Sequence, residues 1–463
     1  MKKLSLNENF ISRIWLNPSY YNDLKTTDGR LVNVINYGIP NADSGADFSD
    51  ALIKIDDVIY SGDVEIHQSV NDWNLHKHKK DAKYNKVILH VAFWKDDFPG
   101  SSISQSKREI PTVILSKFLT SSIHEVWKDI INNPSPKFKL PCFDSNNEVN
   151  SDTKKEWVKD VGMARLVYRA GRIKFRKGFL SEDLHISSKK DVWEKIFLEF
   201  TFEALGFSKN KTQFLNLSKL IDLKKTKKYV AGIQDADALL FGAAGFLCET
   251  KDEYQNDLIK RWNELQPLLK FDSMNRAEWH FFRLRPLNFP TLRIAYASAF
   301  MLEIIKSDFL KRIVFCFKNS NNVFKDLTSL FLEIDFAEFW KYHYDFGKKS
   351  KKENSVIGKS RVTDIIINVV IPLMYLYSKE FSDEELFIKV KKAYLTTKDK
   401  SENNVLDVMI KQLGIKPANI CESQGLIHLH NFYCVKGNCG ECKIGEKVFD
   451  KFAVNEVLKI ILY

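Results

Sequence analysis

Hydrophobic positions in the first hundred residues predict a small mixed α/β unit. Apolar residues at near-helical spacing predict a helix over 6–16. Short apolar runs predict three strands, over 31–35, 51–55 and 58–67. The run KVILHVAF (86–93) is almost continuously apolar, which is typical of a strand buried on both faces. The polar stretch before it predicts a second helix, over 71–85. The order helix, three strands, helix, strand, with a tight turn at Asp56-Asp57, predicts a mixed sheet.

The pattern changes along the rest of the chain. Prolines at 134, 136 and 141 lie in a polar stretch, so residues 101–160 are expected to form a poorly ordered bridge. Helical periodicity dominates from about residue 160, for example over 192–205, 236–247, 253–269 and 294–305. We therefore expect an α+β protein of mixed architecture in three parts. These are an α/β domain over 1–145, a mainly helical domain over 146–415 and a small cysteine-rich module over 416–463.

Composition narrows the class of protein without fixing its function. The 463 residues are 44% hydrophobic and 28% charged, which is typical of globular proteins with a substantial core. The net charge of +11 is compatible with a polyanionic partner such as nucleic acid, and equally with solvated lysine-rich faces. Seven cysteines in a chain of this length do not form a disulfide framework. The N-terminus lacks the features of a secretory signal, and runs such as 365–376 are too short to span a bilayer. We expect a cytoplasmic protein without a membrane partner.

Acidic residues and a histidine flank the second and third predicted strands. Asp47 stands just before one strand, and Glu65 and His67 are two residues apart on the next, so the latter two point to the same face. If the strands pair across the turn, Asp47 and Glu65 approach one another. A divalent cation relieves the repulsion between two such carboxylates, and it can activate water for attack on a phosphodiester.

The segment GADFSDALIKIDDVIYSGDVEIH (45–67) resembles the core motif of the PD-(D/E)XK nuclease superfamily. The resemblance implies that Asp47 and Glu65 bind Mg²⁺ or Mn²⁺, and that Glu8 on the first helix is an additional acidic residue. Two positions depart from the motif. Ala46 replaces its proline, and His67 stands where a lysine is expected, so no permanent ammonium is supplied there.

The next segment, DWNLHKHKKDAKYNKVILHV, adds a cluster of histidines. His76, His78 and Asp81 directly follow the Glu65 strand, and His90 lies in the buried strand. On a helix, His78 and Asp81 would share one face. The cluster favours a functional site. The alternatives are a polar network that attaches the helix to the sheet, and a zinc site made by His76, His78, Asp81 and His90.

The whole chain resembles a bacterial family of uncharacterised proteins, domain of unknown function 2851. The segments that carry this resemblance are TTDG, GADF, SGDVEIH, DWNLHKHKKDAKYN, VILHV, LLFGAAGFL, FRLRPLNFPTLRIA, SQGLIHL and the cysteine-rich end. The family implies no particular activity.

Arginines surround a proline break in the helical region. Arg283, Arg285 and Arg293 lie in FFRLRPLNFPTLRIA, where they could bind the phosphates of a nucleic acid. The favoured alternative is pairing of these arginines with carboxylates of the protein itself, which would fix a helix junction.

Cysteines near the C-terminus have the close spacing of a metal site. Cys434, Cys439 and Cys442 are separated by four and two residues, with glycines that permit tight turns. Cys421 is the expected fourth ligand, and His428 and His430 are alternatives. We expect Zn²⁺, with an iron–sulfur cluster and metal-free thiols as the other possibilities. Cys142 is expected to be an ordinary residue.

Together these patterns predict a metal-dependent, nuclease-like phosphodiesterase that acts on nucleic acid. Asp47 and Glu65 would bind the metal, His67 would take the lysine position, and Glu8 and His78 would be supporting ligands or the base. The first alternative is a non-catalytic nucleic-acid-binding or assembly protein on a degenerate nuclease core. The second is a histidine-rich zinc hydrolase of another class.

Overall fold

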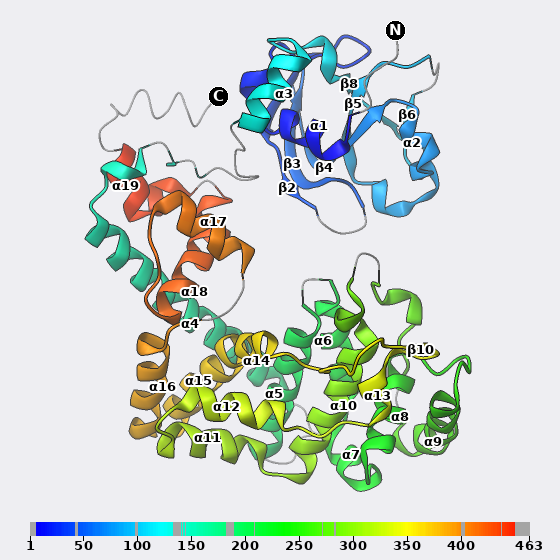
Figure 1. Ribbon diagram of the computed structural model, residues 1–463, viewed down its shortest axis with the longest axis vertical. Helices are drawn as coiled ribbons and strands as arrows, with labels where there is room; N and C mark the ends of the chain where they lie inside the picture. The colour runs from blue at the N-terminus through cyan, green and yellow to red at the C-terminus, as the bar shows by residue number, and fades with distance from the viewer. Residues whose placement is uncertain are drawn as a thin grey trace. The chain divides into compact units, whose positions relative to one another are not determined.

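The computed structural model divides into two compact units, one ending at Lys139 and one beginning at Leu140 (Figure 1). It describes residues 6–41, 45–97, 101–132, 140, 142–143, 145–181, 189–207, 209–270, 272–281, 284–399, 403–436 and 438–449. The N-terminal unit is a mixed sheet with short helices, and the second unit is mainly helical. The expected α+β class is confirmed at this level. The expected boundaries of three domains stay predictions.

A mixed sheet forms the centre of the N-terminal unit. Its strands run in the order β1-β3-β4-β5-β8, and a short β2 pairs with β3. The bounds of the main elements are α1 Glu8–Trp15, β1 Val32–Asn36, β2 Ile39–Pro40, β3 Phe48–Ile55, β4 Val58–Ser69, β5 Val87–Trp94 and β8 Thr112–Ile114. Strand β3 is antiparallel to β1 and β4, whereas β5 is parallel to β4 and β8. The expected first helix, the expected strands and the mixed sheet are therefore confirmed.

Strand β4 separates the core from the site. Val64 and Ile66 are fully buried and pack with α1 residues such as Trp15 in the main core of this unit. Because side chains alternate along a strand, Glu65 and His67 point to the opposite face. Helices α1 and α3 (Ile123–Asn132) cover the Val64 face, and Figure 1 shows the α2 segment on the other side.

The expected helix over 71–85 is wrong. The structure has three single turns there, α2 (Asp72–Leu75), η2 (His78–Lys80) and η3 (Ala82–Tyr84). Lys77 has φ 63°, a left-handed conformation that a helix cannot continue through.

The expected poorly ordered bridge is also wrong over most of its length. Residues 102–132 contain β6 (Ser102–Ile103), β7 (Glu109–Ile110), β8 and α3, and α4 already begins at Ser151. Strand β8 has only three residues, all buried, and it pairs with β5. Pairing with a distant strand, rather than a local pattern, makes it a strand. The three prolines that suggested disorder lie outside the described residues.

The second unit is a set of packed helices around one large apolar core. The main helices are α4 Ser151–Ser181, α5 Lys189–Leu205, α6 Lys211–Leu220, α7 Leu223–Tyr229, α8 Ile233–Ala243, α9 Glu253–Leu269, α10 Pro290–Lys306, α11 Phe309–Asn319, α12 Val323–Leu332, α14 Lys359–Ile365, α15 Ile371–Glu380, α16 Glu384–Thr396, α17 Asn404–Leu413, α18 Ile420–Leu429 and α19 Lys443–Phe449. The helices expected from periodicity over 192–205, 253–269 and 294–305 are confirmed, and α8 ends one turn earlier than expected.

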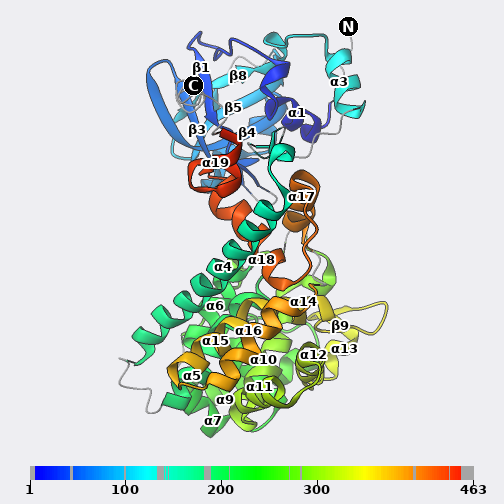
Figure 2. The same ribbon diagram turned by 90° about the vertical axis from the view of Figure 1, so that its left-hand side faces the viewer.

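Helices α4 and α18 lie side by side in the second unit (Figure 2). Two glycines permit their close approach. A Cβ atom at Gly425 would lie 2.0 Å from the carbonyl oxygen of Val158, and one at Gly162 would lie 2.1 Å from that of Cys421. Any larger residue at either position would force the backbones apart.

One continuous helical run, 359–380, is long and apolar enough to cross a membrane by length and composition alone, which the sequence pattern did not lead us to expect. Buried residues make up 67% of its most apolar window. A core helix passes the same test.

Candidate metal centre

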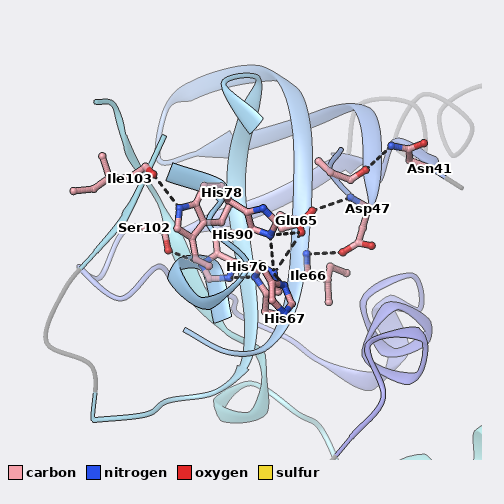
Figure 3. A network of polar contacts seen from close by, with 12 residues as sticks. Asn41, Asp47, Glu65, Ile66, His67, His76, His78, His90, Ser102 and Ile103 are labelled. Carbon is pink, nitrogen blue, oxygen red and sulfur yellow. Dashed lines mark hydrogen bonds and ion pairs between the residues drawn. The ribbon is translucent and has the colours of Figure 1, made fainter. Parts of the chain in front are cut away.

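Asp47 and Glu65 meet where β3 begins, as their positions on paired strands predict. The backbone N–H of Asp47 donates to Oε2 of Glu65 at 3.0 Å. The carboxylate of Asp47 in turn accepts the backbone N–H of Ile66 at 2.9 Å. Figure 3 shows the Asp47 carboxylate turned toward that amide, while the Glu65 side chain extends toward the histidines. The two carboxylates are therefore adjacent but engaged with different partners.

Three histidine rings form a cluster, and two of them, His67 and His78, contact the other oxygen of Glu65. Nε2 of His67 lies 3.1 Å from Nδ1 of His76 and 3.2 Å from Nε2 of His78. The three ligand nitrogens all lie within 4.8 Å of one another. Oε1 of Glu65 is 3.4 Å from Nε2 of His67 and 3.2 Å from Nε2 of His78. His67 and His78 are buried and His76 is exposed, so the cluster opens to solvent at His76.

Lys77 makes the pairing of His76 and His78 possible. Residues i and i+2 of a helix point in different directions, so a regular helix would separate these two rings. The left-handed Lys77, with φ 63°, reverses the chain between the end of α2 and the start of η2. Both rings then face His67. The sequence pattern missed this turn because lysine is an unusual residue at positive φ.

The nitrogen of His67 has more polar neighbours than hydrogen bonds it can make. Nε2 lies within 3.4 Å of His76, His78 and Glu65, yet a ring nitrogen forms a single hydrogen bond, as donor or as acceptor. A network of hydrogen bonds alone would use one of these three contacts, and His78 would then donate to Oε1 of Glu65 instead. A cation at this point could interact with all of them.

His90 and Ser102 hold the ring of His67 through its other nitrogen, Nδ1. Its Nδ1 lies 2.9 Å from Nε2 of His90, and Nδ1 of His90 lies 2.7 Å from Oγ of Ser102. If His67 donates from Nδ1 and His90 donates to Ser102, the lone pair of His67 Nε2 faces the cluster. This is the tautomer that a metal ligand requires.

Aromatic rings enclose the site on its buried side. Trp73 packs against His78 and His90 with ring centroids 5.2 and 5.3 Å apart, and its Nε1 donates to the carbonyl of Ile103 at 2.9 Å. Tyr84 lies against His78 at a centroid distance of 3.7 Å. These contacts hold the rings in fixed orientations.

Burial controls the protonation of the cluster. It lowers the pKa of His78 to about 4 and that of His90 to about 3, and it lowers the pKa of His67 further still. All three rings are therefore neutral near pH 7, the form that binds metals. Burial and the nearby charge of Asp47 raise the pKa of Glu65 to about 9. A divalent cation beside Glu65 would oppose both effects and favour its carboxylate.

The structure changes the sequence-predicted ligand sets. The zinc set of His76, His78, Asp81 and His90 is wrong, because Oδ1 of Asp81 accepts the N–H of Lys83 as a helix cap and His90 lies behind His67. His67 is not merely a replacement for lysine but the centre of the cluster. Glu8 is exposed at the start of α1, and its charge contributes to the raised pKa of Glu65.

The three arginines that were expected to bind phosphate differ in their surroundings. Arg283 lies outside the described residues. Arg293 is buried, and it donates to the carbonyl of Val356 and to Oδ1 of Asn288. Both acceptors lie within the protein, but they are neutral oxygens and not the carboxylates that were expected. Arg285 is exposed, so its predicted contact with nucleic acid stays a prediction.

Cys421 is not a ligand partner of the other C-terminal cysteines. It lies near the start of α18, which continues without a break into a helical turn ending at Cys434. Thirteen residues of helix separate the two sulfurs by about 20 Å. Cys421 is fully buried against α4, with its Sγ 3.5 Å from the carbonyl oxygen of Lys159. The expectation that Cys421 completes the site is therefore wrong.

The fold and the cluster define an α+β protein with a solvent-accessible set of metal-type ligands in its N-terminal unit. Residues 8–404 match a family described as "Protein of unknown function (DUF2851)", and the chain belongs to that family. The resemblance is thus confirmed over these residues, whereas SQGLIHL and the cysteine-rich end lie beyond the match. No curated protein and no solved structure matches the chain.

Proposed function

We propose that the N-terminal unit is a metal-dependent hydrolase in which His67, His76 and His78 bind the ion. The observation that carries the proposal is the convergence of two ring nitrogens, from His76 and His78, and one carboxylate oxygen on Nε2 of His67. Catalytic zinc sites have three protein ligands and keep one position open for water or substrate. The exposed His76 supports access from solvent.

The ligand spacing fits one small divalent ion. Bonds of about 2.0–2.1 Å from zinc to histidine nitrogen place tetrahedral neighbours about 3.3 Å apart. The separations from His67 to His76 and to His78 are 3.1 and 3.2 Å. The neutral rings and the row formed by His90 and Ser102 are the supporting features that such sites use. Zn²⁺ and Mn²⁺ are the ions that we propose.

Glu65 is positioned to act as the general base. A bound ion would make water more acidic and would polarise the bond under attack. The N–H of Asp47 holds Oε2 of Glu65, so Oε1 is the oxygen that faces the histidines and can take a proton from water. Asp47 thus positions the base, and its own carboxylate is held by the N–H of Ile66.

A phosphodiester of nucleic acid is the proposed substrate. Support comes from the net charge of +11 and from the Asp47 and Glu65 positions on paired strands of a mixed sheet. The likeness to PD-(D/E)XK nucleases belongs to the proposal at this level.

The test compares hydrolysis by three forms of the full chain. Linear, branched and single-stranded DNA, RNA and a nitrophenyl phosphodiester are incubated with Zn²⁺, Mn²⁺ or Mg²⁺. The wild type and His124→Ala, which removes an exposed histidine of α3, should cleave equally. His76→Ala should lose at least about 100-fold in kcat/KM, because it removes an exposed ligand without disturbing the core. No cleavage of any substrate, or equal cleavage by all three forms, would remove the proposal.

A second candidate is a nuclease that binds Mg²⁺ or Mn²⁺ at Asp47 and Glu65 without the histidines. The adjacency of Asp47 and Glu65 favours it, because the charge of Asp47 raises the pKa of Glu65 and a bound cation would relieve that repulsion. It predicts Mg²⁺-dependent cleavage that survives in His76→Ala and disappears in Asp47→Asn. Binding of nucleic acid with a steep salt dependence and no cleavage would instead support the non-catalytic alternative.

A further inference from the structure

A cysteine from the beginning of the second unit lies with those at its end. Cys142 is buried in a turn in which its carbonyl accepts the N–H groups of Ser145 and Asn146 at 3.2 and 2.8 Å. The helical turn that follows, η5 (Asn146–Glu148), packs against α19. The segment that contains Cys142 therefore lies against the segment that follows Cys442, although about 300 residues of chain separate them.

The three C-terminal cysteines occupy a folded loop. Cys434 ends the helical turn His430–Cys434, and Cys439 opens the single turn η10 (Cys439–Glu441). The N–H of Cys442 donates to the carbonyl of Cys439 at 3.2 Å. A Cβ atom on Gly445 would lie 2.2 Å from that same carbonyl oxygen, so only glycine lets α19 approach the loop this closely.

The four thiols affect one another electrostatically. Burial and the thiols of Cys442 and Cys439 raise the pKa of Cys142 to about 11. Burial and the thiols of Cys442, Cys142 and Cys439 raise the pKa of Cys434. None of the chain's cysteines forms a disulfide. The four thiols are therefore reduced, partly or fully buried, and located where η5, the turn that ends at Cys434, η10 and α19 pack against one another.

We propose that Cys142, Cys434, Cys439 and Cys442 bind a metal centre through four thiolates, which joins the start of the second unit to its end. Cation binding offsets the cost of bringing four thiolates together in a buried place. The centre is independent of the hydrolase proposed above, because it lies in the other unit and uses other residues. Its role is structural, since all of its ligand positions are filled by the protein.

The spacing of the sulfurs bears on which metal they bind. A single zinc ion, with bonds of about 2.3 Å to sulfur, places four sulfurs about 3.8 Å apart. Among the described residues, the group whose ligand atoms all lie within 4.8 Å of one another is the histidine cluster, so the cysteine sulfurs are spread more widely. An iron–sulfur cluster accommodates a wider set of thiolates, whereas a single zinc ion would require the loop to close around it.

The experiment measures metal in the full chain purified without oxygen. Zinc, iron and acid-labile sulfide are counted per chain in the wild type, Cys142→Ser and Cys421→Ser, the last as a matched control on a buried thiol outside the centre. Sulfide with iron and absorbance near 400 nm identifies a cluster, and zinc without sulfide identifies a single ion. We expect Cys142→Ser to lose the metal of this centre and Cys421→Ser to retain it.

A second measurement uses the wild type alone, so that misfolding of a variant cannot decide the result. Native protein is alkylated with N-ethylmaleimide before and after metal removal by a chelator, and the modified cysteines are identified by mass spectrometry. Cys142, Cys434, Cys439 and Cys442 should become reactive together after chelation. Loss of metal in Cys421→Ser but not in Cys142→Ser, or no protection of these four thiols before chelation, would overturn the proposal.

Discussion

Glu65 in the N-terminal unit and Asp237 in the helical unit are both buried acids with a raised pKa, but the groups around them differ. Asp237 accepts hydrogen bonds from the hydroxyl of Tyr254 at 2.6 Å and from Nε1 of Trp340 at 3.0 Å. These neutral donors limit the rise in its pKa to about 6. Glu65 accepts one N–H from Asp47 and lies beside the charge of that residue, and its pKa is raised to about 9.

The surroundings of the two acids indicate which of them lies in a site that can bind a ligand. In the helical unit, the buried Glu199 is paired with Arg176, and the buried Asp237 accepts hydrogen bonds from neutral donors, although its Oδ1 has no hydrogen-bond partner among the described residues. At Glu65 and His67, three histidine rings and a carboxylate come together, and the cluster opens to solvent at His76. Histidine nitrogens and carboxylate oxygens gathered in this way are the groups that bind a divalent cation. We therefore assign function to the first region and stability to the second.

The largest expected effect is the difference in kcat between a variant of Glu65 and a matched variant of Asp237. Glu65→Gln should lower kcat on the cleaved phosphodiester by about 10²–10⁴-fold, because an amide cannot accept a proton from water. Asp237→Asn, the matched acid-to-amide change in the other unit, should leave kcat within about twofold of the wild type. Steady-state kinetics at saturating metal measures both. Equal losses in the two variants would contradict the division of roles.

The next effect is the pH dependence of the stability that Asp237 contributes. The folded-state pKa of Asp237 is about 6 against an ordinary value of 3.8, so folding favours the protonated form. Its contribution to stability is complete below pH 4 and is lost as the pH rises through 6. Relative to Asp237→Asn, the wild type should lose up to about 3 kcal/mol of unfolding free energy between pH 4 and pH 7. Denaturant unfolding of both proteins at several pH values measures the difference, and a constant difference would show that the pKa is not raised.

A smaller effect tests the residues behind the cluster. His90→Gln should weaken metal binding by about 10–100-fold, because the ring of His67 loses the partner that fixes its tautomer. His124→Gln, on the exposed face of α3, should bind metal as the wild type does. Competition with a chromophoric chelator measures the affinity. Unchanged affinity in His90→Gln would mean that His67 needs no support from behind.

The smallest effect tests the turn between His76 and His78. At the left-handed φ of Lys77, glycine avoids a steric cost, so Lys77→Gly should stabilise the protein by about 1 kcal/mol. Lys77→Val should destabilise it by about the same amount and also weaken metal binding, because a β-branched residue resists this conformation. Unfolding and metal titration of the pair check both signs. Opposite signs would mean that the turn is not left-handed in solution.

Period-two alternation was enough to predict part of the site. It placed Val64 and Ile66 in the core and Glu65 and His67 on the other face, and it brought Asp47 beside Glu65. Apolar periodicity likewise predicted β5 and the long helices, since continuous or regularly spaced apolar residues leave few alternatives.

Other parts depend on contacts that local sequence does not encode. The ligand pair His76 and His78 requires one left-handed lysine, and the position of His90 behind His67 requires the parallel pairing of β4 and β5. Cys142 lies near Cys442 only because distant segments of the second unit pack together. In each case the tertiary structure selects the partners.

Metal binding by the three histidines is the central claim, and counting tightly bound Zn²⁺ tests it most directly. The full chain is freed of metal, reconstituted with Zn²⁺ and passed through a desalting column, and zinc is counted per chain in the wild type, His76→Ala and His124→Ala. We expect that His76→Ala binds one zinc ion fewer than the wild type and that His124→Ala binds the same number. Identical zinc content in all three proteins would contradict it.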